Sequence, residues 1–272
     1  MDPVTLGVAF ALGSAALNAT WNLRLKMAPD PLRVAAVAFP LATLLASPMV
    51  LVVWLSAGRP GLDPAGWVLA AVSGAVQVGY LHVLSRAYQR GDISSVYPTA
   101  RGTAPVIAVL LGVAVLGERL PPLHWIAVAI LVAGVWLVRP GAASRAALIP
   151  ALAVGVLIAG YSALDRLGVQ AGPWWLYGWL VLAVMTAGLL PSARRPADRA
   201  AFPVAVLAGA SYSLVLAALS VAPLAIVAPV RLVAGTVLVS GWGVLRLGEH
   251  DRLPQKVAGA IALVTGVVLM AV

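Results

Sequence analysis

The sequence predicts an all-α integral membrane protein with ten transmembrane helices, arranged as two inverted five-helix repeats. Three observations support this prediction. They are an apolar composition, ten apolar runs long enough to cross a bilayer, and an internal repeat at a fixed offset of 131 residues.

The composition places the chain in a membrane. Of the 272 residues, 62% are hydrophobic and only 10% are charged, whereas a soluble domain carries roughly 25% charged residues. The net charge of +9 is scattered between apolar runs, which is typical of loops at a lipid surface and not of nucleic-acid binding. Because the chain has no cysteine, disulfides, thiol catalysis and cysteine metal sites are excluded.

Ten runs have the length of a membrane span. A helix needs about 20 apolar residues to cross ~30 Å of hydrocarbon. Turn-forming residues separate the runs, as at Pro29-Asp30-Pro31 and Arg139-Pro140-Gly141. No basic segment precedes the first run, so we expect it to be a span and not a cleaved signal peptide. The predicted spans are 4–23, 32–56, 65–88, 93–116, 123–140, 147–164, 173–190, 202–220, 223–246 and 255–272.

An internal repeat organises these spans. Ala87–Glu118 aligns with Ala218–Glu249 without a gap. Two odd-numbered repeats in one chain must lie in opposite orientations across the membrane, an arrangement that places the site of many secondary transporters near the midplane. The predicted repeats are 1–141 and 142–272, within one integral membrane domain. The recurring residues include Pro98 and Pro229, Gly112 and Gly243, Gly117-Glu118 and Gly248-Glu249.

This pattern resembles the drug/metabolite transporter superfamily in its ten-helix, EamA-like form. The resemblance rests on Ala87–Pro98, Pro105, Gly112–Glu118, the helix Trp125–Val138, the matching second-half residues Pro229, Gly248-Glu249 and Thr265-Gly266-Val267, and Asn18, Trp21 and Asn22 in the first span. It implies two inverted repeats around a cavity lined by helices 1, 3, 4, 6, 8 and 9. It also implies movement of small metabolites, without specifying one substrate.

Two arginines lie inside predicted spans. Arg101 and Arg231 each fall about eight residues into their helix, hence ~12 Å below its end. A charge at helix centre costs roughly 2.5–3.5 kcal/mol on insertion scales, so it normally faces a wet cavity or a partner. We expect both to bind an anionic group such as a carboxylate or phosphate. The alternatives are that they reach the interface or pair with Asp92 or Asp165.

The two prolines before these arginines have two interpretations. Proline removes a backbone donor and breaks one helix hydrogen bond. Pro98 and Pro229 are therefore predicted hinges or helix breaks at the site, with a fixed packing kink as the alternative. Since Arg231 is one residue out of register with Arg101, the two side chains can point about 100° apart.

Polar and aromatic side chains supply the other cavity candidates. Asn18, Trp21 and Asn22 share one face of the first span because they are three and four residues apart. Such groups either orient a substrate in an apolar pocket or bond neighbouring helices. The remaining candidates are Gln77 and Tyr80 in the third span, Tyr97 in the fourth, Tyr161 in the sixth and Tyr212 in the eighth.

For the carboxylates Glu118, Glu249 and Asp165, a structural role is the primary expectation. Glu118 and Glu249 are expected to fix loops, with Arg119, Arg246 or Arg252 as partners, and a role in coupling is the alternative. Asp165 is the best-placed proton-coupling candidate and His82 the second, but a salt bridge to Arg166 or Arg24 is the expected role of Asp165. Proton coupling, exchange and uniport all stay open. Trp125, Trp174, Trp175 and Tyr177 are expected in an aromatic belt at the membrane surface.

The function expected from these features is secondary transport of small organic metabolites, anionic or zwitterionic, by alternating access. A lipid or lipid-head-group flippase is the alternative. An enzyme is disfavoured because no metal cluster, Ser–His–acid set or acidic dyad lies at membrane depth. We expect no cofactor, no metal and no nucleic-acid partner. The small-molecule substrate and the lipid bilayer are the expected partners, and a monomer is the default with a dimer as the alternative.

The sequence also gives expectations about cellular location and membrane orientation. The chain is expected to be a multi-pass protein of the cell (inner) membrane. Thirteen lysines and arginines follow odd-numbered spans and three follow even-numbered ones, so the positive-inside rule places both termini outside. Relatives of the resembled family usually have both termini in the cytoplasm, and import and export both stay open.

Overall fold

The computed structural model describes residues 2–90, 93–138, 145–193, 200–247 and 253–271, and its regular elements there are all helices. The predicted ten helices are confirmed within these ranges. The largest boundary differences are four residues, at the ends of α1 (Met27 against 23) and α6 (Gly168 against 164). The elements are α1 (Pro3–Met27), α2 (Pro31–Ser56), α3 (Pro64–Arg90), α4 (Ile93–Ala114), α5 (Pro122–Val138), α6 (Arg145–Gly168), α7 (Trp174–Leu189), the short 3₁₀ helix η1 (Leu190–Ser192), α8 (Ala201–Val221), α9 (Leu224–Leu247) and α10 (Leu253–Ala271).

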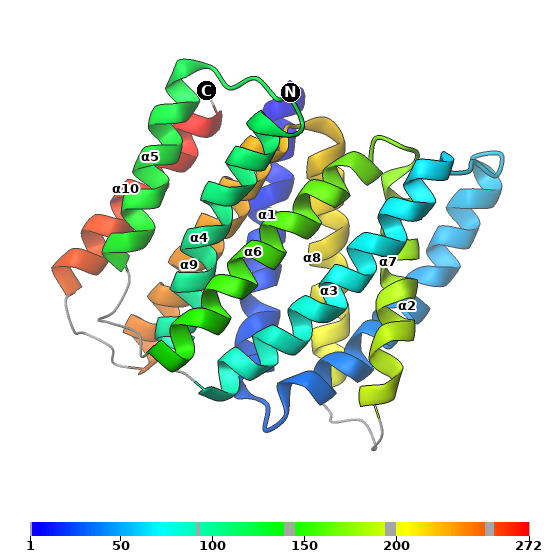
Figure 1. Cartoon of the computed structure of the whole chain (residues 1–272), viewed down its shortest axis with the longest axis horizontal. Helices are drawn as coiled ribbons and strands as arrows, with labels where there is room; N and C mark the ends of the chain where they lie inside the picture. The colour runs from blue at the N-terminus through cyan, green and yellow to red at the C-terminus, as the bar shows by residue number, and fades with distance from the viewer. Residues whose placement is uncertain (1, 91–92, 139–144, 194–199, 248–252, 272) are drawn as a thin grey trace.

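Length and composition fit a bilayer. Among the described residues, α1, α2, α3, α6, α7 and α8 are long and apolar enough to cross a membrane, and α4, α5, α9 and α10 contain shorter apolar stretches. The outer face of α2 exposes large apolar side chains, including Leu44, Met49 and Val52. Exposed apolar surface of this kind suits contact with lipid and not with water. Helix α1 begins and α10 ends at the same edge of the molecule (Figure 1).

The first two helices begin where local chemistry predicts. The side chain of Asp2 accepts hydrogen bonds from the backbone N–H of Val4 and Thr5, both at 3.0 Å, and Pro3 occupies the first helical position. Asp30 caps α2 in the same way through the N–H of Arg33, with Pro31 next in the chain. An aspartate cap followed by proline satisfies otherwise unpaired donors and presets the helical φ angle.

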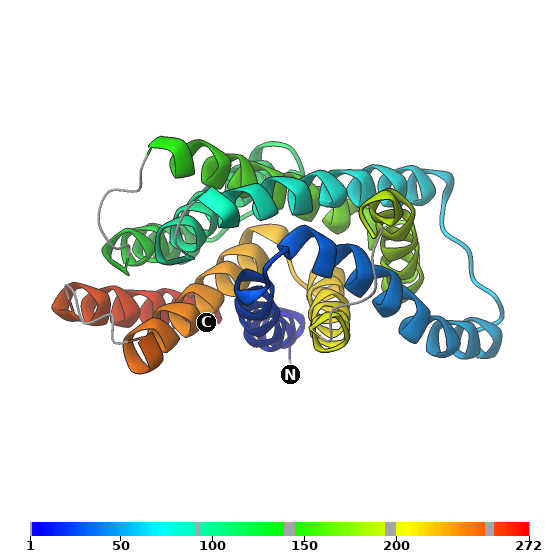
Figure 2. The ribbon, with the colours of Figure 1, turned by 90° about the horizontal axis from the view of Figure 1, so that it is seen from below.

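The helices form two layers, seen from the end in Figure 2. One layer contains α3, α4, α5, α6 and α7, and the other contains α1, α2, α8, α9 and α10. Within the first, α6 packs between α3 and α4, and α7 packs on α3; within the second, α1 packs between α8 and α9, and α2 packs on α8. The layers touch through the pairs α2 with α7, α4 with α9, and α5 with α10.

The helix contacts of the two halves of the chain correspond. Helix αn of the first half corresponds to the helix numbered five higher in the second half. Under this correspondence α1–α8 matches α6–α3, α1–α9 matches α6–α4, and α2–α8 matches α7–α3, and all of these pairs are in contact. Two five-helix repeats related by a twofold axis would produce this pattern. Helices of both halves of the chain occur in each layer, so the two halves interlock instead of lying side by side. The division at residue 141 and the inverted relation stay predictions.

Glycines allow close packing where the layers meet at α5 and α10. A Cβ added to Gly134 would lie 2.6 Å from Leu263, and one added to Gly266 would lie 2.5 Å from Leu131. Each leucine thus fits over the glycine of the facing helix. Small residues permit such approach between membrane helices, where packing and not water exclusion drives association.

Candidate functional site

A cavity lies between the two layers, and we call it the central cavity. Its empty volume is about 380 Å³. Seven of the ten predicted cavity residues line it, together with four further residues. The predicted residues are Asn18, Trp21, Gln77, Tyr80, Tyr161, Tyr212 and Arg231, and the additional ones are Phe39, Met185, Ala208 and Ser211.

Arg231 supplies the positive charge of the central cavity. The residue is 6% exposed, and its Nε donates to Ser14 Oγ at 3.0 Å. Ser14 Oγ donates in turn to the carbonyl of Ser211 at 2.8 Å, and Ser211 Oγ donates to the carbonyl of Ser14 at 2.9 Å. Among the described residues, no carboxylate lies within ion-pair distance of Arg231. Its charge therefore faces the cavity, held in place by α1 and α8.

The proline predictions have a partial outcome. Helix α9 continues as an α-helix through Pro229 from Leu224 to Leu247, and the backbone of α4 is helical from Ile93 to Ala114. The predicted helix break is therefore wrong, while the choice between hinge and fixed kink stays open. The side chains of Tyr97, Pro98 and Arg101 lie outside the described residues, so their predicted roles stay predictions.

Asn22 does not line the central cavity, contrary to expectation. Its Nδ2 donates to the carbonyl of Asn18 at 2.9 Å and to Asn18 Oδ1 at 3.1 Å, and its Oδ1 accepts from Tyr88 OH at 3.1 Å. One helical turn beyond Asn18, this fully buried amide joins α1 to α3. The interhelical alternative describes it better than substrate contact does.

Aromatic rings pack around the cavity in two edge-to-face pairs. Trp21 and Phe39 have ring centroids 6.3 Å apart at 89°, and Tyr80 and Tyr161 have centroids 5.6 Å apart at 66°. Offset or edge contacts of this kind fix ring orientation. The cavity wall therefore combines aromatic surfaces of fixed orientation with polar side chains.

Behind the cavity wall, a buried carboxylate gathers three hydroxyl groups. Asp165 Oδ1 accepts from Ser73 Oγ at 2.5 Å and from Tyr177 OH at 3.0 Å, and Oδ2 accepts from Tyr212 OH at 3.1 Å. Gln77 Nε2 donates to both Ser73 Oγ and Tyr212 OH, each at 3.1 Å. We call these five residues the carboxylate network.

Two expectations about this region are wrong. Asp165 forms no salt bridge with Arg166 or Arg24; adjacent helical residues point about 100° apart, and Arg166 pairs with Glu118 instead. Tyr177, expected in the aromatic belt, is fully buried in the carboxylate network. The second coupling candidate, His82, places Nδ1 2.9 Å from the carbonyl of Val78 in its own helix.

The repeated Gly-Glu motif has a physical explanation in its first copy. Gly117, which follows the end of α4, adopts a left-handed φ of +67°, and the N–H of Glu118 donates to the carbonyl of Gly112 at 2.9 Å. The Glu118 carboxylate then accepts from the backbone N–H groups of Leu224 and Ala225 at the start of α9. A Cβ on Gly112 would lie 2.5 Å from Glu118 Oε2, so this glycine makes room for the carboxylate.

The partner expected for Glu118 is therefore corrected. Arg166 Nε donates to Glu118 Oε1 at 3.1 Å, whereas Arg119 is exposed. The carboxylate sits at a helix N-terminus, where negative charge is favoured. Glu118 thus ties α4 to both α6 and α9. The second copy, Gly248-Glu249, lies outside the described residues.

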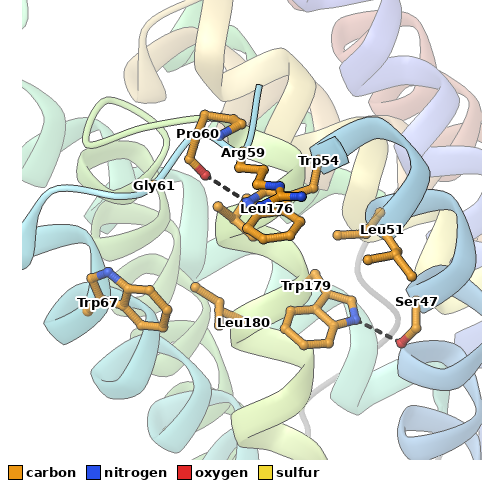
Figure 3. Close-up of a pocket in the computed structure, with 11 residues that line it drawn as sticks. Ser47, Leu51, Trp54, Arg59, Pro60, Gly61, Trp67, Leu176, Trp179 and Leu180 are labelled. Carbon is orange, nitrogen blue, oxygen red and sulfur yellow. Dashed lines mark hydrogen bonds between the residues drawn. The ribbon is translucent and has the colours of Figure 1, made fainter. Parts of the chain in front are cut away.

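A second, larger pocket opens between α2, α3 and α7 (Figure 3), and we call it the outer pocket. Its empty volume is about 790 Å³. Trp179 Nε1 donates to Ser47 Oγ at 2.9 Å, and Trp54 Nε1 donates to the carbonyl of Pro60 at 3.1 Å. The lining residues are Ser47, Val50, Leu51, Trp54, Arg59, Pro60, Gly61, Trp67, Leu176, Trp179 and Leu180.

The two spaces lie along the same pair of helices. Phe39 and Met185 line the central cavity, and Ser47 and Trp179 line the outer pocket. Thr43 lies between Phe39 and Ser47 on α2, and its Oγ1 is 3.1 Å from the carbonyl oxygen of Leu182, which lies between Trp179 and Met185 on α7. Thr43 therefore joins α2 to α7 in the segment between the two spaces.

Comparisons with known proteins agree with this architecture. Residues 5–139 match the model of the EamA-like transporter family. Twenty chains of known structure match, and one crystal structure gives a TM-score of 0.75 at 17% identity over 97% of this chain and 95% of that one, which shows a shared fold. No curated protein sequence matches. The helices, their apolar composition and the family match over residues 5–139 identify the chain as a multi-pass membrane protein similar to the EamA-like transporter family.

Proposed function

We propose that this chain transports small organic anions or zwitterions through the central cavity by alternating access. One observation carries the proposal: the buried guanidinium of Arg231 lines the cavity without a carboxylate partner among the described residues. A charged group in a membrane helix that lacks an internal partner is a functional candidate by default.

The chemistry of Arg231 selects the ligand class. A guanidinium has five N–H donors in a planar fork that matches a carboxylate or phosphate. Ser14 engages Nε, and the terminal nitrogens have no hydrogen-bond partner in the described part of the chain. An anionic group in the cavity would both neutralise the charge and accept these donors, which a neutral metabolite cannot do.

The rest of the cavity lining suits a small polar ligand. The space that the centre of a water-sized sphere can reach in this conformation is about 30 Å³, well below the roughly 300–1,000 Å³ of small-molecule sites, so the layers must separate further to admit a metabolite. The Asn18 and Gln77 amides and the tyrosine hydroxyl groups are suited to orient a second polar group, such as an ammonium or a hydroxyl. Trp21 and Phe39 supply apolar surface. Amino-acid-like and short carboxylate or phosphate compounds meet these conditions.

The layered fold suggests which parts move. Because the sequence halves interlock, they cannot rock against each other as separate bodies. The two layers, joined at α2–α7 and at α4–α9 and α5–α10, are the better candidates for the moving units. In this proposal, the two layers separate first near one membrane surface and then near the other, while the central cavity stays between them.

A lipid or lipid-head-group flippase is the second candidate, favoured by the outer pocket. That pocket is larger than the central cavity, is mostly apolar, and adjoins the exposed apolar face of α2. An acyl chain could occupy it while a head group approached Arg231. The contact between Thr43 and the Leu182 carbonyl lies along α2 and α7 between the two spaces, which favours two distinct spaces and therefore the metabolite transporter.

The test is a ligand-induced stabilisation screen on the purified protein, using carboxylates, phosphate esters, amino acids, neutral analogues and amines. A ligand at 100 times its Kd stabilises the folded state by about 2.7 kcal/mol. We expect anionic or zwitterionic compounds to stabilise the wild type and Arg231→Gln to abolish the effect, with the exposed Arg119→Gln as the matched control. Equal stabilisation of wild type and Arg231→Gln would contradict the proposal. Movement of labelled lipid in liposomes, with no metabolite binding, would favour the flippase.

A further inference from the structure

The carboxylate network adjoins the central cavity through Gln77 and Tyr212, but its carboxylate has no assigned role in substrate binding. Asp165 is only 1% exposed and is not part of the cavity wall. Its two oxygens accept three hydroxyl groups from α3, α7 and α8. Within the described residues it has no cationic hydrogen-bond partner. An acid buried this deeply without an ion pair is costly when ionised, even with good hydrogen bonds.

The charges that face Asp165 come from few elements. Ser73 on α3, Tyr177 on α7 and Tyr212 on α8 are neutral donors, and Arg231 on α9 is a cation in the wall of the central cavity, which Tyr212 also lines. Arg166, next to it on α6, is engaged by Glu118. Helix α4 has one charged residue, Arg101, whose side chain lies outside the described residues. Arg231 is therefore the described cation of the cavity that balances the charge of Asp165 at a distance, although the two side chains form no ion pair.

We infer that Asp165 is the binding site for a coupling proton, and that the chain carries each monovalent anion together with one proton. This inference rests on the proposed function and adds the coupling ion to it. An anion bound at Arg231 cancels the positive charge that balances Asp165, and a proton from water then joins the carboxylate. With Arg231 and Asp165 both charged, the empty site is neutral; with an anion and a proton bound, it is neutral again.

This neutrality has an energetic consequence. In a low-dielectric interior, an uncompensated charge is expensive to move between the two access states. The empty site and the site with both anion and proton avoid that cost, whereas a site with the anion alone carries one net negative charge. Coupling follows because only the two neutral forms cross readily between the outward and inward states.

Tyr212 provides the route for the proton. The residue is part of the wall of the central cavity, and its hydroxyl group donates to Asp165 Oδ2. It can pass its hydroxyl proton to the carboxylate while it accepts one from water in the cavity, so the phenol ends unchanged. Tyr177 donates to the same carboxylate but is not part of the cavity wall. The two tyrosines are therefore a matched pair, of which only one connects Asp165 to the cavity.

The first test needs no substrate. Infrared difference spectra of the purified protein at decreasing pH should show a protonated carboxyl band that Asp165→Asn removes. At one fixed pH, Arg231→Gln should enlarge this band, because the variant lacks the cation that balances the carboxylate. If no band distinguishes wild type from Asp165→Asn wherever the protein stays folded, or if Arg231→Gln leaves the band unchanged, the inference fails.

The second test examines the route. After transfer to heavy water, deuterium should replace the Asp165 carboxyl proton severalfold more slowly in Tyr212→Phe than in Tyr177→Phe. Equal rates in the two variants would overturn the relay. Because neither infrared experiment uses a ligand, both keep their meaning if the anionic substrate class is wrong. Conversely, anion binding that depends on Arg231 would support the proposed function even if Asp165 takes up no proton.

Discussion

Removing Glu118 should destabilise the protein more than any exposed substitution near it, because one carboxylate links three helices. It accepts from Leu224 N at 2.8 Å, from Ala225 N at 2.9 Å and from Arg166 Nε at 3.1 Å. The Glu118 side chain is 8% exposed and that of Arg166 is 16% exposed. The contacts are therefore largely shielded from water.

The magnitude follows from these contacts. Breaking a buried ion pair by removing one partner costs about 3–5 kcal/mol, and each hydrogen bond to a charged group contributes roughly 1.5–3 kcal/mol. In a variant without the Glu118 carboxylate, Arg166 keeps its hydrogen bond to the carbonyl of Leu219 and its partial contact with water, so its charge remains partly solvated. We expect Glu118→Ala to lower the free energy of unfolding by about 3–4 kcal/mol, and Glu118→Gln, which keeps one acceptor, by about 2 kcal/mol.

The assay is reversible unfolding in mild detergent or bicelles, supported by thermal denaturation. Arg119→Ala is the control, since Arg119 is adjacent in sequence and exposed; it should change the free energy of unfolding by less than about 0.5 kcal/mol. A double-mutant cycle of Glu118→Gln with Arg166→Gln should give a coupling energy of about 1–2 kcal/mol. If Glu118→Ala is no more destabilising than Arg119→Ala, the assigned role of the repeated Gly-Glu motif is wrong.

Two further predictions concern packing and the outer pocket. In α6, Gly168→Ala places a Cβ 2.0 Å from the Tyr177 ring and should lower the free energy of unfolding by about 1–3 kcal/mol. Gly160→Ala is the control, because a Cβ there meets nothing within 4 Å and should leave stability unchanged or slightly higher. Equal melting temperatures of the two variants would contradict this prediction. In the outer pocket, Trp179→Phe should lower the free energy of unfolding by about 1 kcal/mol, because the hydrogen bond to Ser47 is lost. A decrease no larger than that caused by Trp67→Phe would refute this role of the Trp179–Ser47 bond.

Much of the fold could be predicted because a bilayer imposes a simple rule. Every span needs a long apolar run, so helix number and bounds followed from composition and turn residues. The repeat also pointed to matched helices. It did not reveal that α1 packs on α8 and α3 on α6, because helix packing depends on shape and small-residue contacts that periodicity does not encode.

The site was only partly predictable for a related reason. Polar residues in apolar spans, such as Gln77 and Arg231, stand out in sequence and do line one cavity. Ser14, four residues before Asn18 on the same face, could have been added by the same stripe argument. Phe39 and Met185 could not, since apolar residues in apolar helices carry no signal. Asp165 was noticed, but its hydroxyl partners come from three other helices and only the folded chain brings them together.

Accessibility of the central cavity tests the account most directly. The chain has no cysteine, so Ala208→Cys introduces one thiol in the cavity wall, and Ala218→Cys, buried on the same helix away from the cavity, is its control. A membrane-impermeant thiol reagent should modify Ala208→Cys from either side of the membrane, more slowly when a stabilising anion is bound, and should spare Ala218→Cys. Modification of Ala208→Cys from neither side, or from one side under all conditions, would contradict alternating access through this cavity.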